Sequence, residues 1–116
     1  MEIEREHLGG VPIIRAGGQI DMSNYVEVHG LILAEIEEGH PHIVLNLRKV
    51  DFMDSAMLGM LLRSLDKAEQ RGGLLVLVTN PFIDRILSVT GLTNIFDFFS
   101  NEDQAVRSVS ERVANF

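Results

Sequence analysis

The chain has 116 residues, of which 46% are hydrophobic, and this is enough for one domain with a single packed core. Seventeen Asp and Glu against ten Lys and Arg give a formal net charge of −7, and the absence of any basic run argues against nucleic-acid binding. The sequence contains no cysteine, which excludes disulfides, thiolate metal ligands and a thiol nucleophile.

The N-terminus is acidic and lacks the apolar segment of a secretory signal. No apolar run approaches the roughly 18 residues that a membrane span needs. We therefore expect a cytoplasmic protein without direct membrane insertion. Because the sequence has no internal repeat, linker or low-complexity segment, residues 1–116 are expected to form a single domain.

The first third of the chain predicts a β-hairpin followed by a helix. Residues 3–7 and 11–16 read as strands joined by a Gly-Gly turn, and the charges on the first of them suit an edge strand. Asn24, with Glu27 three residues later, predicts a helix start, and Gly39 predicts its end.

The remaining two thirds predict strands that alternate with helices. The expected strands are residues 43–47, 74–78 and 95–98, and the expected helices begin at Ser55, at Asn80-Pro81 and at Ser100. The second helix should run from residue 55 to about residue 70, with a stripe of leucines on one face. Such alternation is typical of an α/β domain.

The junction between the strand at 43–47 and the helix at 55–70 is the most informative stretch. Asp54 and Ser55 lie directly before the first periodic apolar positions of the helix. A helix start offers unpaired N–H groups and partial positive charge, so a phosphoryl group on a hydroxyl there would be stabilised. A plain helix cap explains the same two residues, and the local pattern leaves both interpretations open.

The sequence FMDSAMLG at residues 52–59 resembles the signature F-x-D-S-S-G-L-G of the STAS domain family, the anti-sigma factor antagonists. Further similarities occur in the right order between about residues 11 and 98: GQID at 18–21, the apolar strand at 43–47, and RGG at 71–73 before another apolar strand. The resemblance implies a single STAS-type α/β domain, with a small mixed β-sheet and helices mainly on one face.

The resemblance also implies a function. In this family the serine that follows the motif aspartate is phosphorylated by an anti-sigma factor that is itself a serine kinase, and a serine phosphatase reverses the modification. Ser55 occupies that position, and only the unphosphorylated form would bind the kinase and release the sigma factor. Asp54 matches the motif aspartate, which in the complex with the partner would orient the serine hydroxyl or help to place the metal ion of the kinase, and Asp21 matches a family aspartate that contacts the partner. A helix cap explains Asp54 equally well, and a turn-stabilising carboxylate explains Asp21 equally well.

The chain departs from the family signature at Ala56 and Met57, where a second serine and a glycine are usual. We expect Met57 and Met60 to extend the partner-binding surface, because methionine side chains adapt well to partners. Ordinary burial of both side chains is the alternative. The replacement of glycine by Met57 also favours a second function, which is either a scaffolding STAS subunit of a stress-signalling assembly or a soluble accessory of a membrane transporter.

Catalytic chemistry is not expected. Ser55 lacks a nucleophile-elbow motif, and the chain has neither a dinucleotide-binding fingerprint nor a P-loop, so we predict no enzyme activity and no cofactor. His40 and His42 could share a metal ion, but no further ligands are evident and no metal site is predicted. The oligomeric state is left open.

Overall fold

Strands and helices alternate along the chain as the sequence predicts. The computed structural model describes residues 1–114. Its elements are β1 (Glu2–Leu8), β2 (Val11–Ile20), α1 (Tyr25–Glu37), β3 (His42–Met53), α2 (Ser55–Gln70), β4 (Leu74–Val78), α3 (Pro81–Val89), β5 (Asp97–Phe99) and α4 (Glu102–Ala114). Within residues 1–114 no helix has both the length and the apolar character needed to span a membrane.

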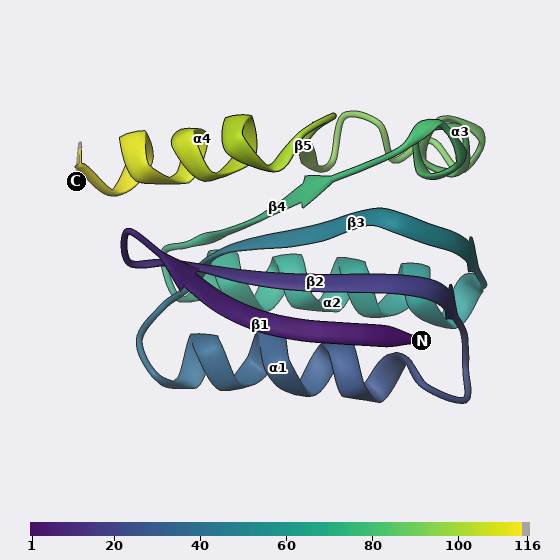
Figure 1. The fold of residues 1–116 in the computed structure, drawn as a ribbon, viewed down its shortest axis with the longest axis horizontal. Coiled ribbons are helices and arrows are strands. Elements are labelled where there is room, and N and C mark those ends of the chain that lie inside the picture. Colours follow the sequence, from purple (N-terminus) through teal and green to yellow (C-terminus); the bar gives the residue numbers. More distant parts are fainter. Residues whose placement is uncertain (115–116) are drawn as a thin grey trace.

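The five strands form one mixed sheet in the order β1-β2-β3-β4-β5 (Figure 1). β1 and β2 are antiparallel and are joined by the predicted tight turn, whereas β2, β3, β4 and β5 run parallel to one another. β1 is an edge strand and carries the charged residues that suit such an edge. The small mixed sheet predicted from the sequence is therefore confirmed.

Three of the four helices cover the same face of the sheet. Each of α1, α2 and α3 connects one parallel strand to the next strand in the same direction, and right-handed crossovers of this kind place their helices on one side. Their buried residues share a core with the sheet, among them Ile32, Leu61 and Ile83. α4 packs on the opposite face, where Ala105 and Val109 belong to a second core.

The segments of β2, β3 and β4 that lie between the two layers of helices are apolar, because both of their faces are covered there. Ile14 and Leu45 belong to the core under α1, α2 and α3, whereas their neighbours Ile13 and Val44 belong to the core under α4. Successive side chains of a strand point to opposite faces, so a strand that lies between two layers of helices needs apolar residues at every position.

β2 and β3 extend further than the sequence predicts. β3 pairs with β4 only through residues 42–46, and its continuation to Met53 pairs with β2 alone. The free edge of this extension is covered by Asn80, whose Nδ2 donates to the carbonyl oxygens of Arg48 and Val50, each at 2.9 Å. The extension places the start of α2 well beyond the end of β4.

Candidate functional site

Two aspartates follow parallel strands at the same edge of the sheet. Ile20 and Met53 are paired in register at the ends of β2 and β3, and Asp21 and Asp54 come directly after them. Because the carboxyl ends of adjacent parallel strands meet, residues 33 positions apart in the sequence become neighbours. The site therefore joins the β2–α1 loop to the start of α2.

Asp54 holds this junction together with both of its carboxylate oxygens. Oδ1 accepts a hydrogen bond from the backbone N–H of Met57 at 3.1 Å and so caps α2. Oδ2 accepts from the backbone N–H of Met22 at 2.9 Å and so fixes the β2–α1 loop. The helix-cap interpretation of Asp54 is confirmed, and the tether to Met22 is an additional role that the sequence did not indicate.

Asp21 organises the loop itself. Its Oδ1 accepts from the hydroxyl of Ser23 at 2.5 Å and from the backbone N–H of Ser23 at 2.9 Å. These two hydrogen bonds stabilise the charged carboxylate and hold the pKa of Asp21 below its ordinary value. The side-chain carbonyl of Asn24 accepts from the Asp21 backbone N–H at 2.9 Å and closes the turn. Asp21 is thus a turn-stabilising group that remains ionised.

Ser55 is the first residue of α2, and its side chain is exposed. Within residues 1–114 its hydroxyl has no hydrogen-bond partner, and the first turn of α2 contains no acidic residue. The N–H groups of a first helical turn and the helix dipole favour an anion at such a position. The hydroxyl is therefore accessible, and its surroundings are suited to a phosphate.

Met57 and Met60 do not lie on the surface, and the prediction that they extend a docking surface is wrong. Both side chains are 0% exposed and belong to the core between α2 and the sheet. Met60 Sδ also accepts a hydrogen bond from the buried hydroxyl of Ser64 at 3.3 Å. The apolar stripe of α2 turns these residues inward together with Leu61 and Leu65, and ordinary burial is the correct interpretation.

Sequence reasoning missed the apolar side chains that are exposed at this edge of the sheet. Met22 is 75% exposed and follows Asp21, and Phe52 is 45% exposed near the end of β3. Contiguous apolar surface marks sites that contact other proteins, whereas single exposed apolar side chains are common on any protein. Phe52 is the first residue of the signature at 52–59, and this position was the signal that could have identified it.

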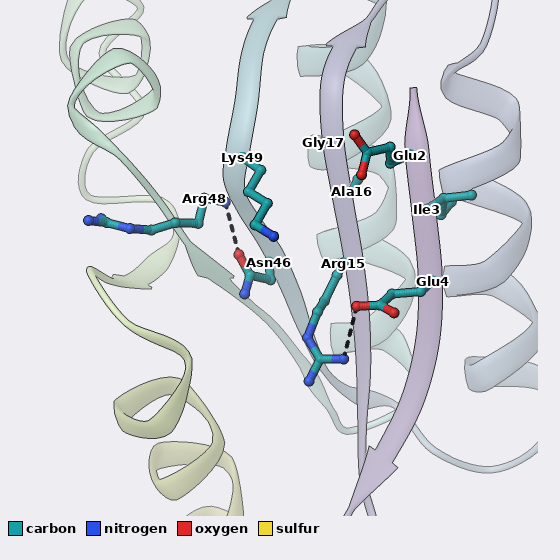
Figure 2. A pocket seen from close by; sticks show the side chains of 9 residues that line it. All are labelled: Glu2, Ile3, Glu4, Arg15, Ala16, Gly17, Asn46, Arg48 and Lys49. Carbon is teal, nitrogen blue, oxygen red and sulfur yellow. Dashed lines mark hydrogen bonds and ion pairs between the residues drawn. The ribbon is translucent and has the colours of Figure 1, made fainter.

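A hollow of about 430 Å³ lies across β1, β2 and β3 on the face that α4 leaves open (Figure 2). Among the charged residues that line it within residues 1–114, Arg15 and Glu4 form the one ion pair. Arg15 pairs with Glu4 at 3.3 Å and with Glu102 at 2.7 Å, and the side chain of Arg48 extends away to donate to the carbonyl of Thr79 at 3.0 Å (Figure 2). Arg15 and its partners thus connect the sheet to the start of α4.

His40 and His42, the pair considered as metal ligands, have different surroundings. The Nδ1 atom of His40 lies 3.1 Å from Glu35 Oε2, and His7 contacts the same carboxylate. His42 is not a member of this group, and burial and the nearby charge of Arg112 lower its pKa. The structure therefore brings His7, Glu35 and His40 together.

The fold and the site define a small α/β domain that presents an exposed serine, at the start of a helix, beside a fixed loop. The chain belongs to the STAS domain family, whose family model matches residues 2–105. The matched range extends from β1 into the first turn of α4, so the family covers almost all of the described structure.

Several relatives with assigned names are similar to this chain. It is 35% identical over 108 residues to an anti-sigma F factor antagonist of Paenibacillus polymyxa, covering 91% of this chain and 92% of that protein. The crystal structure of an anti-sigma factor antagonist from Mycobacterium paratuberculosis has a TM-score of 0.84 at 26% identity, covering 94% of this chain and 93% of that one. SpoIIAA in its unphosphorylated form has a TM-score of 0.78 at 22% identity, covering 99% and 98%, and shares the fold.

Proposed function

We propose that this chain is an anti-sigma factor antagonist that is switched by phosphorylation of Ser55. In its unphosphorylated form it binds a serine-kinase anti-sigma factor, and this partner then releases its sigma factor. The kinase phosphorylates Ser55, and the phosphorylated chain dissociates from it. A serine phosphatase then removes the phosphate and restores the binding form. The chain acts in the cytoplasm as a substrate and a ligand, and it catalyses nothing itself.

One observation supports this function above the others: the exposed hydroxyl of Ser55 follows an aspartate whose side chain is fully used in capping and tethering. A kinase needs an accessible hydroxyl on a surface of defined shape. Asp54 fixes the backbone around Ser55. Its carboxylate oxygens accept from the N–H groups of Met22 and Met57 and not from the Ser55 hydroxyl. The similarity to the Paenibacillus polymyxa antagonist, at 35% identity over almost the whole chain, supports the same role.

We assign the docking surface to Asp21, Met22, Phe52 and Ser55, all at the carboxyl edge of β2 and β3. Met22 and Phe52 offer exposed apolar area, and Asp21 offers a carboxylate that its hydrogen bonds keep ionised. An apolar centre with a charged neighbour is a common composition for a protein interface. The partner's complementary surface is expected to be apolar with a basic group opposite Asp21.

Phosphorylation would act on the interface and leave the fold intact. A phosphoserine adds about −1.5 to −2 charges at neutral pH. Without a partner, the start of α2 and the solvent accommodate this charge. Under a docked partner the phosphate would be enclosed next to the carboxylate of Asp54, where an unpaired buried charge is strongly unfavourable.

The scaffolding role considered from the sequence was favoured by the replacement of glycine by Met57, and the position of Met57 in the structure does not support it. Met57 is buried in the core, so its side chain does not alter the surface beside Ser55. A stable large assembly without phosphorylation would restore the scaffolding role as the better explanation.

The test is to incubate the purified chain with ATP and candidate serine-kinase anti-sigma factors, and to measure intact mass and modified peptides. We expect one added phosphate on Ser55 and none on the Ser55→Ala variant. Ser23→Ala is the matched control and should still take up one phosphate. Ser23 is an exposed serine of the β2–α1 loop, and its hydroxyl donates a hydrogen bond to Asp21. Phosphate on Ser23, or on Ser55→Ala, would contradict the assignment.

A further inference from the structure

Three potential metal ligands converge at the end of the domain opposite to Ser55. His7 lies near the end of β1, Glu35 lies in the last turn of α1, and His40 follows the Gly39 turn after that helix. This location is beside the start of β2, whereas Asp21 and the docking surface lie beyond its end. The cluster is therefore separate from the proposed switch.

The side chains of the cluster already face one another. His7 Nε2 lies 2.7 Å from Glu35 Oε1, and His40 Nδ1 lies 3.1 Å from Glu35 Oε2. The two imidazole rings are edge to face, with centroids 5.3 Å apart. The ligand atoms of all three residues lie within 4.8 Å of one another. Two imidazoles and one carboxylate thus face one another from β1, from the last turn of α1 and from the segment that follows α1.

Glu35 is the feature that sets this cluster apart from an ordinary surface group. Its side chain is 0% exposed, while those of His7 and His40 are 39% and 43% exposed. A buried carboxylate needs cationic or hydrogen-bonding partners, and this one is fixed in place by the helix that bears it. The two half-exposed histidines leave an open side through which an ion and water can enter.

We propose that His7, Glu35 and His40 bind a divalent transition-metal ion of the zinc type, with water in the remaining position. Imidazole nitrogen and carboxylate oxygen bind Zn²⁺ at about 2.0–2.2 Å, and a site with three protein ligands leaves one position open. Tetrahedral bonds of that length separate the ligand atoms by roughly 3.3 Å. The observed separations of 2.7 Å and 3.1 Å are close to this value, so small side-chain rotations are sufficient.

Arg5 is the group that competes with the ion. Its Nε lies 2.8 Å from Glu35 Oε1, so a bound cation would replace the guanidinium at that oxygen. Arg5 already has a second partner, because its Nη2 lies 3.0 Å from Glu38 Oε2. The guanidinium can therefore turn toward Glu38 and keep its charge paired when an ion occupies the cluster.

The test is calorimetric titration of the whole, tag-free chain with Zn²⁺ and with Ni²⁺ in a buffer that does not chelate metals, at slightly alkaline pH. We expect one ion per chain and, at an excess of about 100-fold over the Kd, a rise in Tm of about 5 °C or more. His7→Ala and His40→Ala should each weaken binding at least tenfold, as loss of one of three protein ligands does. Thermal unfolding without metal checks that both variants are folded.

Two further variants make the test specific. His29→Ala removes a histidine outside the cluster and should leave the affinity unchanged. Arg5→Gln removes the competing cation and should tighten binding several-fold. The absence of any metal-dependent heat or Tm change would overturn the proposal. Binding that survives His7→Ala but is lost in His42→Ala would also overturn it, because the ion would then be held by His40 and His42.

Discussion

The backbone N–H of Met22 donates a hydrogen bond to Asp54 Oδ2 over 2.9 Å, and this contact joins the β2–α1 loop to the start of α2. The other oxygen of the same carboxylate caps α2 through the N–H of Met57. One side chain therefore fixes both the loop that presents Met22 and the helix turn that presents Ser55. The relative positions of these two surface residues depend on Asp54.

Replacing Asp54 with Ala should lower the free energy of unfolding by about 1–3 kcal/mol, because α2 loses its cap and the loop loses its acceptor. Urea unfolding followed by circular dichroism measures this. Asp54→Asn keeps one carbonyl acceptor and should give an intermediate loss. If Asp54→Ala unfolds at the same urea concentration as the wild type, neither hydrogen bond contributes to stability.

Ser55→Asp should leave the fold almost unchanged and abolish partner binding. An acidic side chain in the first turn of a helix interacts favourably with the dipole by about 0.3–1 kcal/mol, and Ser55 is exposed. We expect a Tm within about 4 °C of the wild type. Pull-down or calorimetry with the anti-sigma factor that phosphorylates Ser55 measures binding, and Ser55→Ala is the control that should still bind. A large fall in Tm would show that Ser55 has a structural role.

Met57→Ala should lower the free energy of unfolding by about 2–5 kcal/mol, because it removes a fully buried side chain and leaves a cavity. Chemical denaturation gives the value. This outcome differs from the expectation drawn from the sequence, in which Met57 lay on the partner-binding surface. A change below about 0.5 kcal/mol, the range of surface substitutions, would show that Met57 does not contribute to the core.

Met22→Ala makes the same substitution at a surface methionine, since the side chain of Met22 is 75% exposed. Its stability should change by no more than about 0.5 kcal/mol, whereas the affinity for the anti-sigma factor should fall at least tenfold if Met22 is a central contact. Phe52→Ala should behave in the same way. The affinity can be measured by calorimetry with unphosphorylated protein. Wild-type affinity in both variants would remove this edge of the sheet from the docking surface.

Glu102 should make stability depend on pH. Arg15 donates to its two carboxylate oxygens at 2.7 Å and 2.8 Å, and this pairing holds the pKa of Glu102 below its ordinary value of 4.5. The unfolded chain therefore binds the proton more readily than the folded chain. The stabilisation is complete well above pH 4.5 and is lost as the pH falls through the lower pKa of the folded state.

The Glu102→Gln variant tests this pH dependence. It should lose about 1–2 kcal/mol near neutral pH, where the charged pair is intact. Its stability should also decline less steeply than that of the wild type between about pH 5 and pH 3. Urea midpoints measured across this range give both results. Glu4→Gln, at an exposed partner of Arg15, is the control that should change little, and parallel pH profiles for all three proteins would contradict the assignment.

The order and type of the elements could be read from the sequence because local patterns determine them. Helix α2 runs from Ser55 to Gln70 as predicted, since Asp54 provides a cap and the apolar positions repeat at helical spacing. The signature at residues 52–59 located the exposed Ser55. The ends of β2 and β3 were missed, because strand length there depends on pairing between the two strands and not on local composition.

Tertiary structure decided which side chains reach the surface and which meet across the fold. Met57 and Ser55 are two residues apart, yet the packing of α2 on the sheet buries one and exposes the other. The contact between Met22 and Asp54 requires two parallel strands to end side by side. The cluster of His7, Glu35 and His40 requires the edge strand to lie beside the end of α1. By itself the sequence determined the order of the helices and strands and the position of Ser55, because both depend on local chemistry. Contacts between residues that are distant in the sequence were decided by the sheet that brings them together.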